Sequence, residues 1–341
     1  MTIRHAALLP LCLLGLTMAA HAQTLHVGTV GVVSDAPFFI ADAEGYFRDE
    51  GLDVSFVRFD SAAKMIAPLG NGDLDAGGGA TSAALFNAAK RRVNIRIVAD
   101  KARNSPGYGF QAVMARTDLV KSGRIKSLAD LKGSTIALSA KGNSEEFILS
   151  VALAKGGLKL ADITEVYLGF PEHPAAFANS AIDASVSTEP TISFIEKSGS
   201  AIKLAGVDDI YPNYQTAVSY VGADFLRDKP DAAHHFMRAL IRGMRFYVDS
   251  LKDGRLAGPN AERTIAILTK YGTVKDPAIY RALVPSGLDP NGEVNMDSLR
   301  ATWQFFRDTR QIDGSVTVED IVDMSLAHDA VASLGPYVPT K

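Results

Sequence analysis

The chain has 341 residues, which is enough for two ordinary domains with their own hydrophobic cores. Hydrophobic residues make up 47% of it and charged residues 21%, which is typical of a soluble globular protein. With a formal net charge of −3, neither nucleic acid nor an anionic membrane is expected as a partner.

Residues 1–22 have the features of a secretory signal peptide. Arg4 precedes the short apolar run Ala6–Ala20, and Ala20-His21-Ala22 forms an A-x-A cleavage site. We therefore expect cleavage after Ala22 and export to the periplasm. The one cysteine, Cys12, lies inside this run, so a thiol nucleophile is excluded from the mature chain and a structural zinc site is not expected.

Strands alternate with helices in the first part of the mature chain. The predicted strands are Leu25–Val33, Asp53–Phe59, Leu74–Ala76 and Asn94–Ala99. The predicted helices are Phe38–Glu44, Ser61–Leu69 (ended by Pro68) and Thr81–Lys90. This α/β order indicates a parallel sheet that is covered on both faces.

A second unit repeats the same order. Its predicted strands are Thr135–Ser139, Glu165–Leu168 and Ala181–Val186, and its helices are Pro174–Asn179 and Glu145–Lys155, the latter with Asn143 as cap and Glu146 at the capping-box position. The pair Asp75-Ala76 recurs as Asp183-Ala184. We therefore expect two similar lobes whose loops face each other across one cleft, where open α/β sheets bind ligands.

Two segments are suited to connect the lobes, Lys101–Gly109 and Asp208–Gln215. The remainder is predicted to be mostly helical and to pack on the first lobe. A long helix begins near Lys229 and carries one apolar face, and further helical segments follow at Glu262–Tyr271, Leu299–Arg310 and Val318–Leu334; the apolar face consists of Phe236, Leu240, Met244 and Tyr247.

The stretch Leu74–Ala89 carries the most informative local pattern, a short strand, a glycine turn and a helix. Gly77–Gly79 would let another molecule approach the backbone, and Thr81 and Ser82 are good helix caps. The free N–H groups of such a helix start attract an anion. The alternative is a tight connection that binds nothing. The stretch has neither the lysine of a P-loop nor the third glycine of a dinucleotide fingerprint.

Several blocks, in the same order, resemble periplasmic solute-binding proteins of ABC importers for nitrate, sulfonates, taurine and thiamine-pyrimidine precursors. They are Ser34–Val54, Gly70–Ala89, Ser127–Leu149 and Ala181–Pro190. The resemblance implies a type II periplasmic binding protein fold, with a ligand cleft between lobes joined by two crossover strands. We expect lobe 1 to comprise residues 23–104 and 215–341, and lobe 2 to comprise residues 105–214.

The resemblance also implies which loops contact the ligand. Carried over position by position, they contribute Asp35, Ala36, Pro37 and Phe38, then Gly79, Ala80, Thr81 and Ser82, then Gly142, Asn143 and Ser144, and finally Thr188 and Glu189. The enzyme relatives that synthesise the pyrimidine carry a cysteine-rich motif near the second loop. This chain has GGGAT there, without cysteine, which puts that chemistry in doubt.

The residues themselves leave alternatives open. Asp35 is either a ligand acceptor or only a helix cap, Phe38 is favoured over Phe39 as a stacking residue, and Glu189 either touches the ligand or holds its turn. Aromatic walls are expected from Tyr108, Phe110 and Phe170, although core packing is the alternative for Phe110. The secondary candidates are Lys141, Arg103 and His173, each of which is more often a solvated side chain.

No catalytic motif is present, and neither a cofactor nor a metal is predicted. The sequence therefore predicts a monomeric substrate-binding protein that captures a small organic anion, a sulfonate or carboxylate, by lobe closure and delivers it to an ABC permease. Alternatives are a pyrimidine-type thiamine precursor as ligand, a secreted enzyme on the same scaffold, or a sensor for a membrane receptor.

Overall fold

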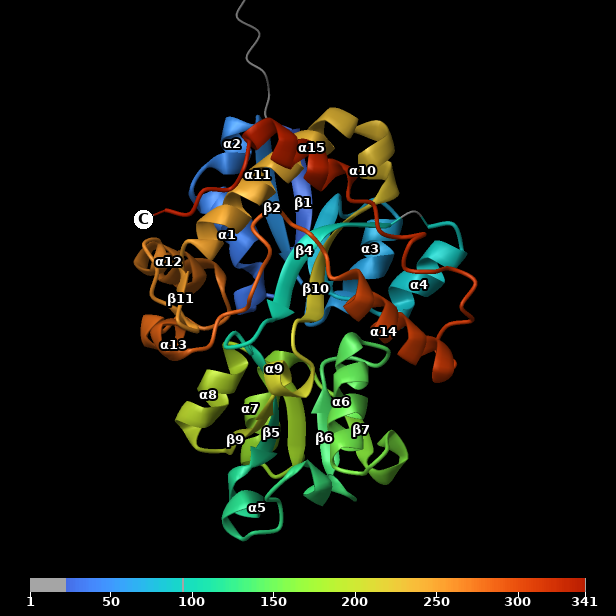
Figure 1. Cartoon of the computed structure of the whole chain (residues 1–341), viewed down its shortest axis with the longest axis vertical. Helices are drawn as coiled ribbons and strands as arrows, with labels where there is room; N and C mark the ends of the chain where they lie inside the picture. Colours follow the sequence, from blue (N-terminus) through green and yellow to red (C-terminus); the bar gives the residue numbers. More distant parts are fainter. Residues whose placement is uncertain (1–22, 94, 341) are drawn as a thin grey trace, which may run out of the picture.

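The structure is a computed structural model that describes residues 23–93 and 95–340, so the predicted signal peptide lies outside the described residues. Two five-stranded sheets form the centres of two lobes that lie end to end (Figure 1). The strand orders are β2-β1-β3-β10-β4 in lobe 1 and β7-β6-β8-β5-β9 in lobe 2. The two sheets therefore share one topology, as the repeated α/β pattern of the sequence predicts.

The strands of lobe 1 are β1 (Gln23–Thr29), β2 (Leu52–Arg58), β3 (Ala76–Ala80), β4 (Arg96–Asn104) and β10 (Tyr214–Val221). The strands of lobe 2 are β5 (Gln111–Arg116), β6 (Thr135–Leu138), β7 (Thr164–Tyr167), β8 (Ala184–Thr188) and β9 (Ala201–Gly206). A small hairpin is made by β11 (Leu251–Lys252) and β12 (Arg255–Leu256).

The α-helices of the lobe-1 half are α1 (Ala36–Ala43), α2 (Tyr46–Asp49), α3 (Ile66–Gly70), α4 (Ala83–Lys90), α10 (Ala223–Asp228), α11 (Pro230–Val248), α12 (Ala261–Tyr271), α13 (Pro277–Ala282), α14 (Met296–Asp308) and α15 (Ser325–Leu334). Those of the lobe-2 half are α5 (Thr117–Lys121), α6 (Ser144–Lys155), α7 (His173–Ala178), α8 (Thr191–Ser198) and α9 (Val207–Ile210). The 3-10 helices are η1 (Val33–Asp35), η2 (Ala62–Met65), η3 (Leu128–Leu131), η4 (Leu160–Asp162) and η5 (Phe170–Glu172).

Each sheet is mixed rather than wholly parallel, which corrects the sequence-based expectation. Strands β1, β2 and β3 are parallel, as are β6, β7 and β8. In contrast, β10 runs antiparallel to β3 and β4, and β5 runs antiparallel to β8 and β9. The reason is connectivity. Both β5 and β10 follow a crossing from the other lobe, so each enters its sheet from the cleft side.

An aspartate plays the same role in both lobes. The Asp75 carboxylate accepts a hydrogen bond from the His26 backbone N–H at 2.8 Å, and the Asp183 carboxylate accepts one from the Thr135 N–H at 3.0 Å. Each aspartate precedes the third strand of its unit and ties it to the first. The Asp-Ala pair that repeats in the sequence is therefore a repeated structural device.

Three local expectations need correction. Gly77–Gly79 lie within β3 and do not form a turn. Their missing side chains make room for neighbours on both faces of the sheet. Pro68 sits inside the short α3 rather than after it. Lys101 to Asn104 extend β4, so the first connection between the lobes is limited to 105–110.

The long helix α11 organises the core of lobe 1. Its predicted apolar face is confirmed, since Phe236, Leu240, Met244 and Tyr247 are all buried. Phe236 stacks on Phe47 with ring centroids 5.4 Å apart, and it also contacts Phe38 at 6.3 Å and Phe225 at 6.1 Å. The segment Val318–Leu334 is predicted as one last helix or a helix pair, and only Ser325–Leu334 of it is α-helical. None of the helices in the described residues is long and apolar enough to cross a membrane.

We expect Phe236→Ala to lower the free energy of unfolding by about 3–5 kcal/mol, because it leaves a cavity between three aromatic rings. Urea denaturation measures this change. The control is Ile202→Ala on β9, whose side chain is 39% exposed and for which we expect a change within about 1 kcal/mol. Similar losses for the two variants would contradict the assignment of Phe236 to the core.

Candidate functional site

The two lobes touch through the beginnings of α4 and α6. The Ala83 N–H donates to the Gly142 carbonyl at 2.9 Å, and the Ser144 N–H donates to the Thr81 carbonyl at 3.0 Å. These hydrogen bonds flank an antiparallel bridge between Ser82 and Asn143. Figure 1 shows α14 beside α6 on the same flank of the molecule. The N–H groups of Ala83 and Ser144 lie at helix starts, where the sequence predicts an anion, but they bind the opposite lobe instead.

Behind this bridge lies a small cavity of about 30 Å³ between the lobes, which we call the inner cavity. Lobe 1 contributes the loop after β1, the end of β3, β4 and β10, and lobe 2 contributes the loop before α6 and the end of β8. The lining residues are Val30, Val32, Ser34, Ala62, Gly79, Ala80, Lys101, Phe110, Gln111, Ser139, Asn143, Glu145, Phe170, Thr188, Thr216 and Ala217. A molecule in this cavity contacts both lobes at once.

A buried ion pair forms the lobe-1 wall. Lys101 on β4 is 1% exposed, and its Nζ lies 2.8 Å from Asp35 Oδ1 and 3.0 Å from Ser34 Oγ. Asp35 Oδ2 accepts hydrogen bonds from the N–H groups of Val30, Gly31 and Val32 at 2.6–3.1 Å. The carboxylate thus holds the loop after β1 and orients the ammonium group.

Glycine at position 78 is required by this arrangement. A Cβ there would lie 2.5 Å from Lys101 Cδ and 2.6 Å from Phe38 Cε2. The lysine stem passes directly over the β3 backbone, and only glycine leaves the necessary space. Gly78 of the sequence motif therefore accommodates the protein's own lysine.

The lobe-2 wall carries a carboxyl group, Glu145 at the start of α6. It is 2% exposed and accepts hydrogen bonds from the Ser139 N–H at 2.7 Å and from Ser139 Oγ at 2.9 Å. Asn143 Nδ2 lies 3.4 Å away. Burial raises the pKa of Glu145 to about 7, because desolvation disfavours the charged form more than these hydrogen bonds stabilise it.

Hydrogen-bond donors surround the rest of the cavity. Gln111 accepts with Oε1 from Asn104 Nδ2 at 3.2 Å and from Thr216 Oγ1 at 2.9 Å, which directs its Nε2 donors elsewhere. The Thr188 hydroxyl lies at the cleft end of β8 and makes a long hydrogen bond to the Phe110 carbonyl, at 3.5 Å. The cavity is therefore rich in donors, with one cation held by Asp35 and one carboxyl group facing it from the opposite lobe.

The predicted site residues fall into three groups. Gly79, Ala80, Asn143 and Thr188 line the inner cavity. Thr81, Ser82, Gly142 and Ser144 build the bridge between the lobes instead. The side-chain hydroxyl of Ser82 is already used as the cap of α4, since it accepts from the Leu85 N–H at 3.3 Å.

The other predicted residues do not line the cavity. Asp35 forms an ion pair with Lys101, which itself lines the cavity. Ala36 and Pro37 are buried at the start of α1, and Phe38 packs on Phe236 in the core. Tyr108 is half-buried in the connection 105–110.

Glu189 holds its turn, which is one of the two roles that the sequence left open. Its carboxylate accepts from the Ser193 N–H and Oγ, both at 3.0 Å, and so supports the start of α8. Its carbonyl accepts from the Val33 N–H of the other lobe at 3.1 Å. Burial raises the pKa of Glu189 to about 7.

Among the secondary candidates, His173 behaves differently from the solvated histidine expected for a loop. It is fully buried, with Nδ1 2.8 Å from Ser187 Oγ and Nε2 3.0 Å from the Leu168 carbonyl, and burial lowers its pKa to about 4. Arg103 pairs with Asp100 at 2.9 Å, and Lys141 is exposed. Phe110 and Phe170 both line the inner cavity.

Sequence reasoning missed ten of the sixteen lining residues, and six of these are polar: Ser34, Lys101, Gln111, Ser139, Glu145 and Thr216. For Lys101 a signal existed, because a charged Asp-Lys pair interrupts the apolar run of β4. Buried charges require partners, so such a pair points to a buried network. The other five polar residues carry no such signal, and only the approach of the lobes brings them together.

Within residues 23–93 and 95–340, no group of three or more His, Cys, Asp or Glu side chains is placed to hold a metal ion.

Residues 33–250 match the family described as "NMT1/THI5 like", which covers more than half of the chain. The chain belongs to this family. The taurine-binding periplasmic protein of Escherichia coli (strain K12) is 24% identical over 233 residues, 68% of this chain and 69% of that protein. Alignments with the first curated relatives cover about two thirds of their length, between 66% and 69%.

The structure of the alkanesulfonate-binding protein SsuA from Xanthomonas axonopodis pv. citri, bound to MOPS, has the same fold as this chain. It has a TM-score of 0.70 at 22% identity, and the superposition covers 89% of this chain and 99% of that one. An enzyme is also related, the 4-amino-5-hydroxymethyl-2-methylpyrimidine phosphate synthase of Schizosaccharomyces pombe. It is 27% identical over 157 residues, 45% of this chain and 41% of the enzyme.

The pKa of Glu145 leads to a prediction for stability. The folded protein keeps the Glu145 proton up to about pH 7, whereas the unfolded chain releases it near pH 4.5. Proton binding by Glu145 therefore stabilises the fold fully below pH 4.5, and this stabilisation is lost as the pH rises through 7. Glu145→Gln removes the titration, so the stability of the wild type relative to the variant should fall by about 2–3 kcal/mol between pH 5 and 8.

Urea denaturation across this pH range measures the difference. Glu189 is present in both proteins, so its own titration cancels. The matched control is Glu172→Gln, an exposed residue of η5, for which the difference from the wild type should stay constant. A constant difference for Glu145→Gln as well would show that this carboxyl group is not held in its neutral form.

Proposed function

We propose that the protein is the periplasmic substrate-binding component of an ABC importer, and that it captures a small organic anion by closing its lobes on it. The observation that carries this proposal is the inner cavity, whose walls come from both lobes and from the connections between them. A solute in that position binds the closed form more tightly than the open form, and so shifts the equilibrium toward closure. An ABC permease is the expected partner.

The balance of donors and acceptors favours an anion. Lys101, Gln111 and Thr188 line the cavity with groups that carry N–H or O–H donors. Lys101 Nζ has three N–H donors and contacts two protein oxygens, and the Thr188 hydroxyl makes only a long hydrogen bond to the Phe110 carbonyl, at 3.5 Å, that an anion can replace. Glu145 opposes an anion only while it is ionised, and its pKa of about 7 makes the neutral, donating form readily available. The names of the taurine- and alkanesulfonate-binding proteins support a sulfonate or a carboxylate of similar size.

A pyrimidine that carries an amino group is the second candidate. Ionised Glu145 would accept hydrogen bonds from an exocyclic amine or a protonated ring nitrogen, and Phe170 lies in the same wall for stacking. The pyrimidine phosphate synthase among the relatives supports this class of compound. We do not propose catalysis, because the cavity's Lys101 is bound by Asp35 and the cysteine motif expected of the pyrimidine-synthesising enzyme relatives is replaced by Gly77–Thr81.

A thermal-shift panel tests the ligand class. It contains taurine, methanesulfonate, benzenesulfonate, acetate, benzoate, nitrate and an aminopyrimidine, because a ligand raises the stability in proportion to ln(1 + [L]/Kd). We expect the sulfonates or carboxylates to stabilise the protein and the aminopyrimidine to have no effect. The reverse result would replace the anion with the second candidate, and a silent panel would contradict both.

A matched pair of variants then locates the bound anion. Thr188→Val removes one hydroxyl from the cavity wall and should weaken the anion's Kd by roughly tenfold, the value of one hydrogen bond to a charged group. Thr135→Val makes the same change at the opposite end of the lobe-2 sheet, on β6, and should leave Kd unchanged. Equal affinities of the two variants, measured by calorimetry, would place the anion outside the inner cavity.

A further inference from the structure

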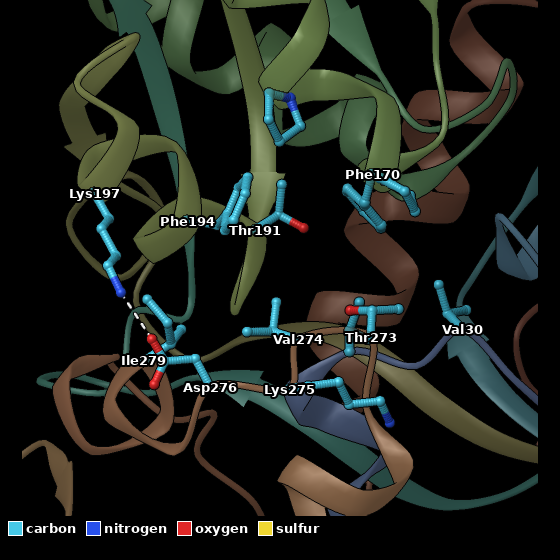
Figure 2. A pocket seen from close by; sticks show the side chains of 13 residues that line it. Val30, Phe170, Thr191, Phe194, Lys197, Thr273, Val274, Lys275, Asp276 and Ile279 are labelled. Carbon is cyan, nitrogen blue, oxygen red and sulfur yellow. Dashed lines mark hydrogen bonds and ion pairs between the residues drawn. The ribbon is translucent and has the colours of Figure 1, made fainter.

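A second and much larger pocket adjoins the inner cavity. It has a volume of about 390 Å³ and lies between α7 and α8 of lobe 2 and the segment 273–279 of lobe 1; we call it the outer chamber. Its lining residues are Val30, Val32, Phe170, Pro171, Pro174, Thr191, Phe194, Lys197, Thr273, Val274, Lys275, Asp276 and Ile279. Figure 2 shows Phe170, Thr191 and Phe194 on one side, facing Thr273 and Val274 across the open space.

The walls of the outer chamber are mainly apolar. Phe194 on α8 is 46% exposed, which is unusual for a large aromatic side chain on a helix of a soluble protein. Val274 and Ile279 lie across from it in lobe 1. At the rim, Lys197 of lobe 2 and Asp276 of lobe 1 form an ion pair at 2.7 Å, so the chamber, like the inner cavity, is bounded by both lobes.

Three residues connect the two spaces. Val30, Val32 and Phe170 belong to the walls of both the inner cavity and the outer chamber. The inner cavity, at about 30 Å³, has room for a small polar head only, whereas known ligand pockets measure roughly 300–1,000 Å³. A solute of ordinary size whose head contacts Lys101 and Thr188 must therefore extend past Phe170 into the outer chamber.

We propose that the outer chamber binds the apolar body of the transported solute, an aryl or branched alkyl group, while the polar head occupies the inner cavity. The substrate class is thus an amphipathic organic anion such as an arylsulfonate or aryl carboxylate, rather than a compact ion such as nitrate or taurine. This inference rests on the proposed function, because it takes the inner cavity as the site of the head group. Phe194 is the specificity-determining residue, since it is the exposed aromatic surface that only a large body covers.

The test compares anions that share a head group and differ in their body, methanesulfonate with benzenesulfonate and acetate with benzoate. In the wild type we expect the aryl member of each bound pair to bind roughly tenfold more tightly or better, from the apolar area that it buries. Phe194→Ala should remove most of this advantage and leave the small anion's Kd unchanged. Ile202→Ala, which shortens a similarly exposed side chain of lobe 2 outside the chamber, should preserve it.

A probe without a head group separates this inference from the proposed function. Indole is titrated against the wild type and both variants by NMR, with resonances of residues 273–279 as the readout. Binding of indole that Phe194→Ala weakens, with no binding of any anion, would refute the anionic head group and support the chamber. Anions that bind without an aryl preference, or indole and aryl anions that bind the Phe194→Ala variant as well as the wild type, would overturn the chamber. Failure of indole and of all anions to bind would overturn both.

Discussion

The cleft of this protein depends on one buried ion pair, Asp35 with Lys101. Removing two charges from water is costly, and a fold tolerates it only if the charges pair with each other and are hydrogen-bonded. Asp35 and Lys101 meet both conditions. Asp35 binds three backbone N–H groups of the loop after β1 and the ammonium group of Lys101, so one carboxylate fixes both the loop and the cation. Gly78 supplies the space for the lysine stem. The lobe-1 wall is thereby rigid and carries a positive charge that is already balanced.

The opposite wall uses the same device with a different charge balance. Glu145 also follows the first strand of its unit and binds the backbone of the preceding loop, but within the described residues no cationic side chain forms an ion pair with it. The pKa of Glu145 is raised as a consequence, so its carboxyl group can donate a hydrogen bond when neutral and accept one when ionised. The proposed anion and the alternative pyrimidine both follow from this asymmetry, in which the neutralised Asp35–Lys101 pair of lobe 1 faces the adaptable Glu145 of lobe 2 across a narrow space.

The sequence predicted the architecture well because the architecture rests on local patterns. The alternation of strands and helices, the repeated Asp-Ala pair and the apolar face of α11 are each encoded within a few residues, and the fold confirms them. The mixed sheets were missed because strand direction depends on chain crossings between lobes. The site was predicted only in part. Gly79 and Asn143 belong to short motifs that a sequence pattern can locate, whereas Lys101 and Glu145 line the cavity from different lobes. Thr81 and Ser144 form a hydrogen bond between the two lobes and do not face free space.

The measurement that tests the central claim most directly is the distance between the lobes in solution. The described residues contain no cysteine, so Lys141→Cys in lobe 2 and Asp308→Cys in lobe 1, both at exposed positions, provide two unique sites for spin labels. With saturating benzenesulfonate or benzoate, the distance distribution should narrow and shift to the shorter separation of the closed form, whereas without an added solute it should include a longer one. An identical distribution in the presence and absence of a solute that binds would contradict capture by lobe closure.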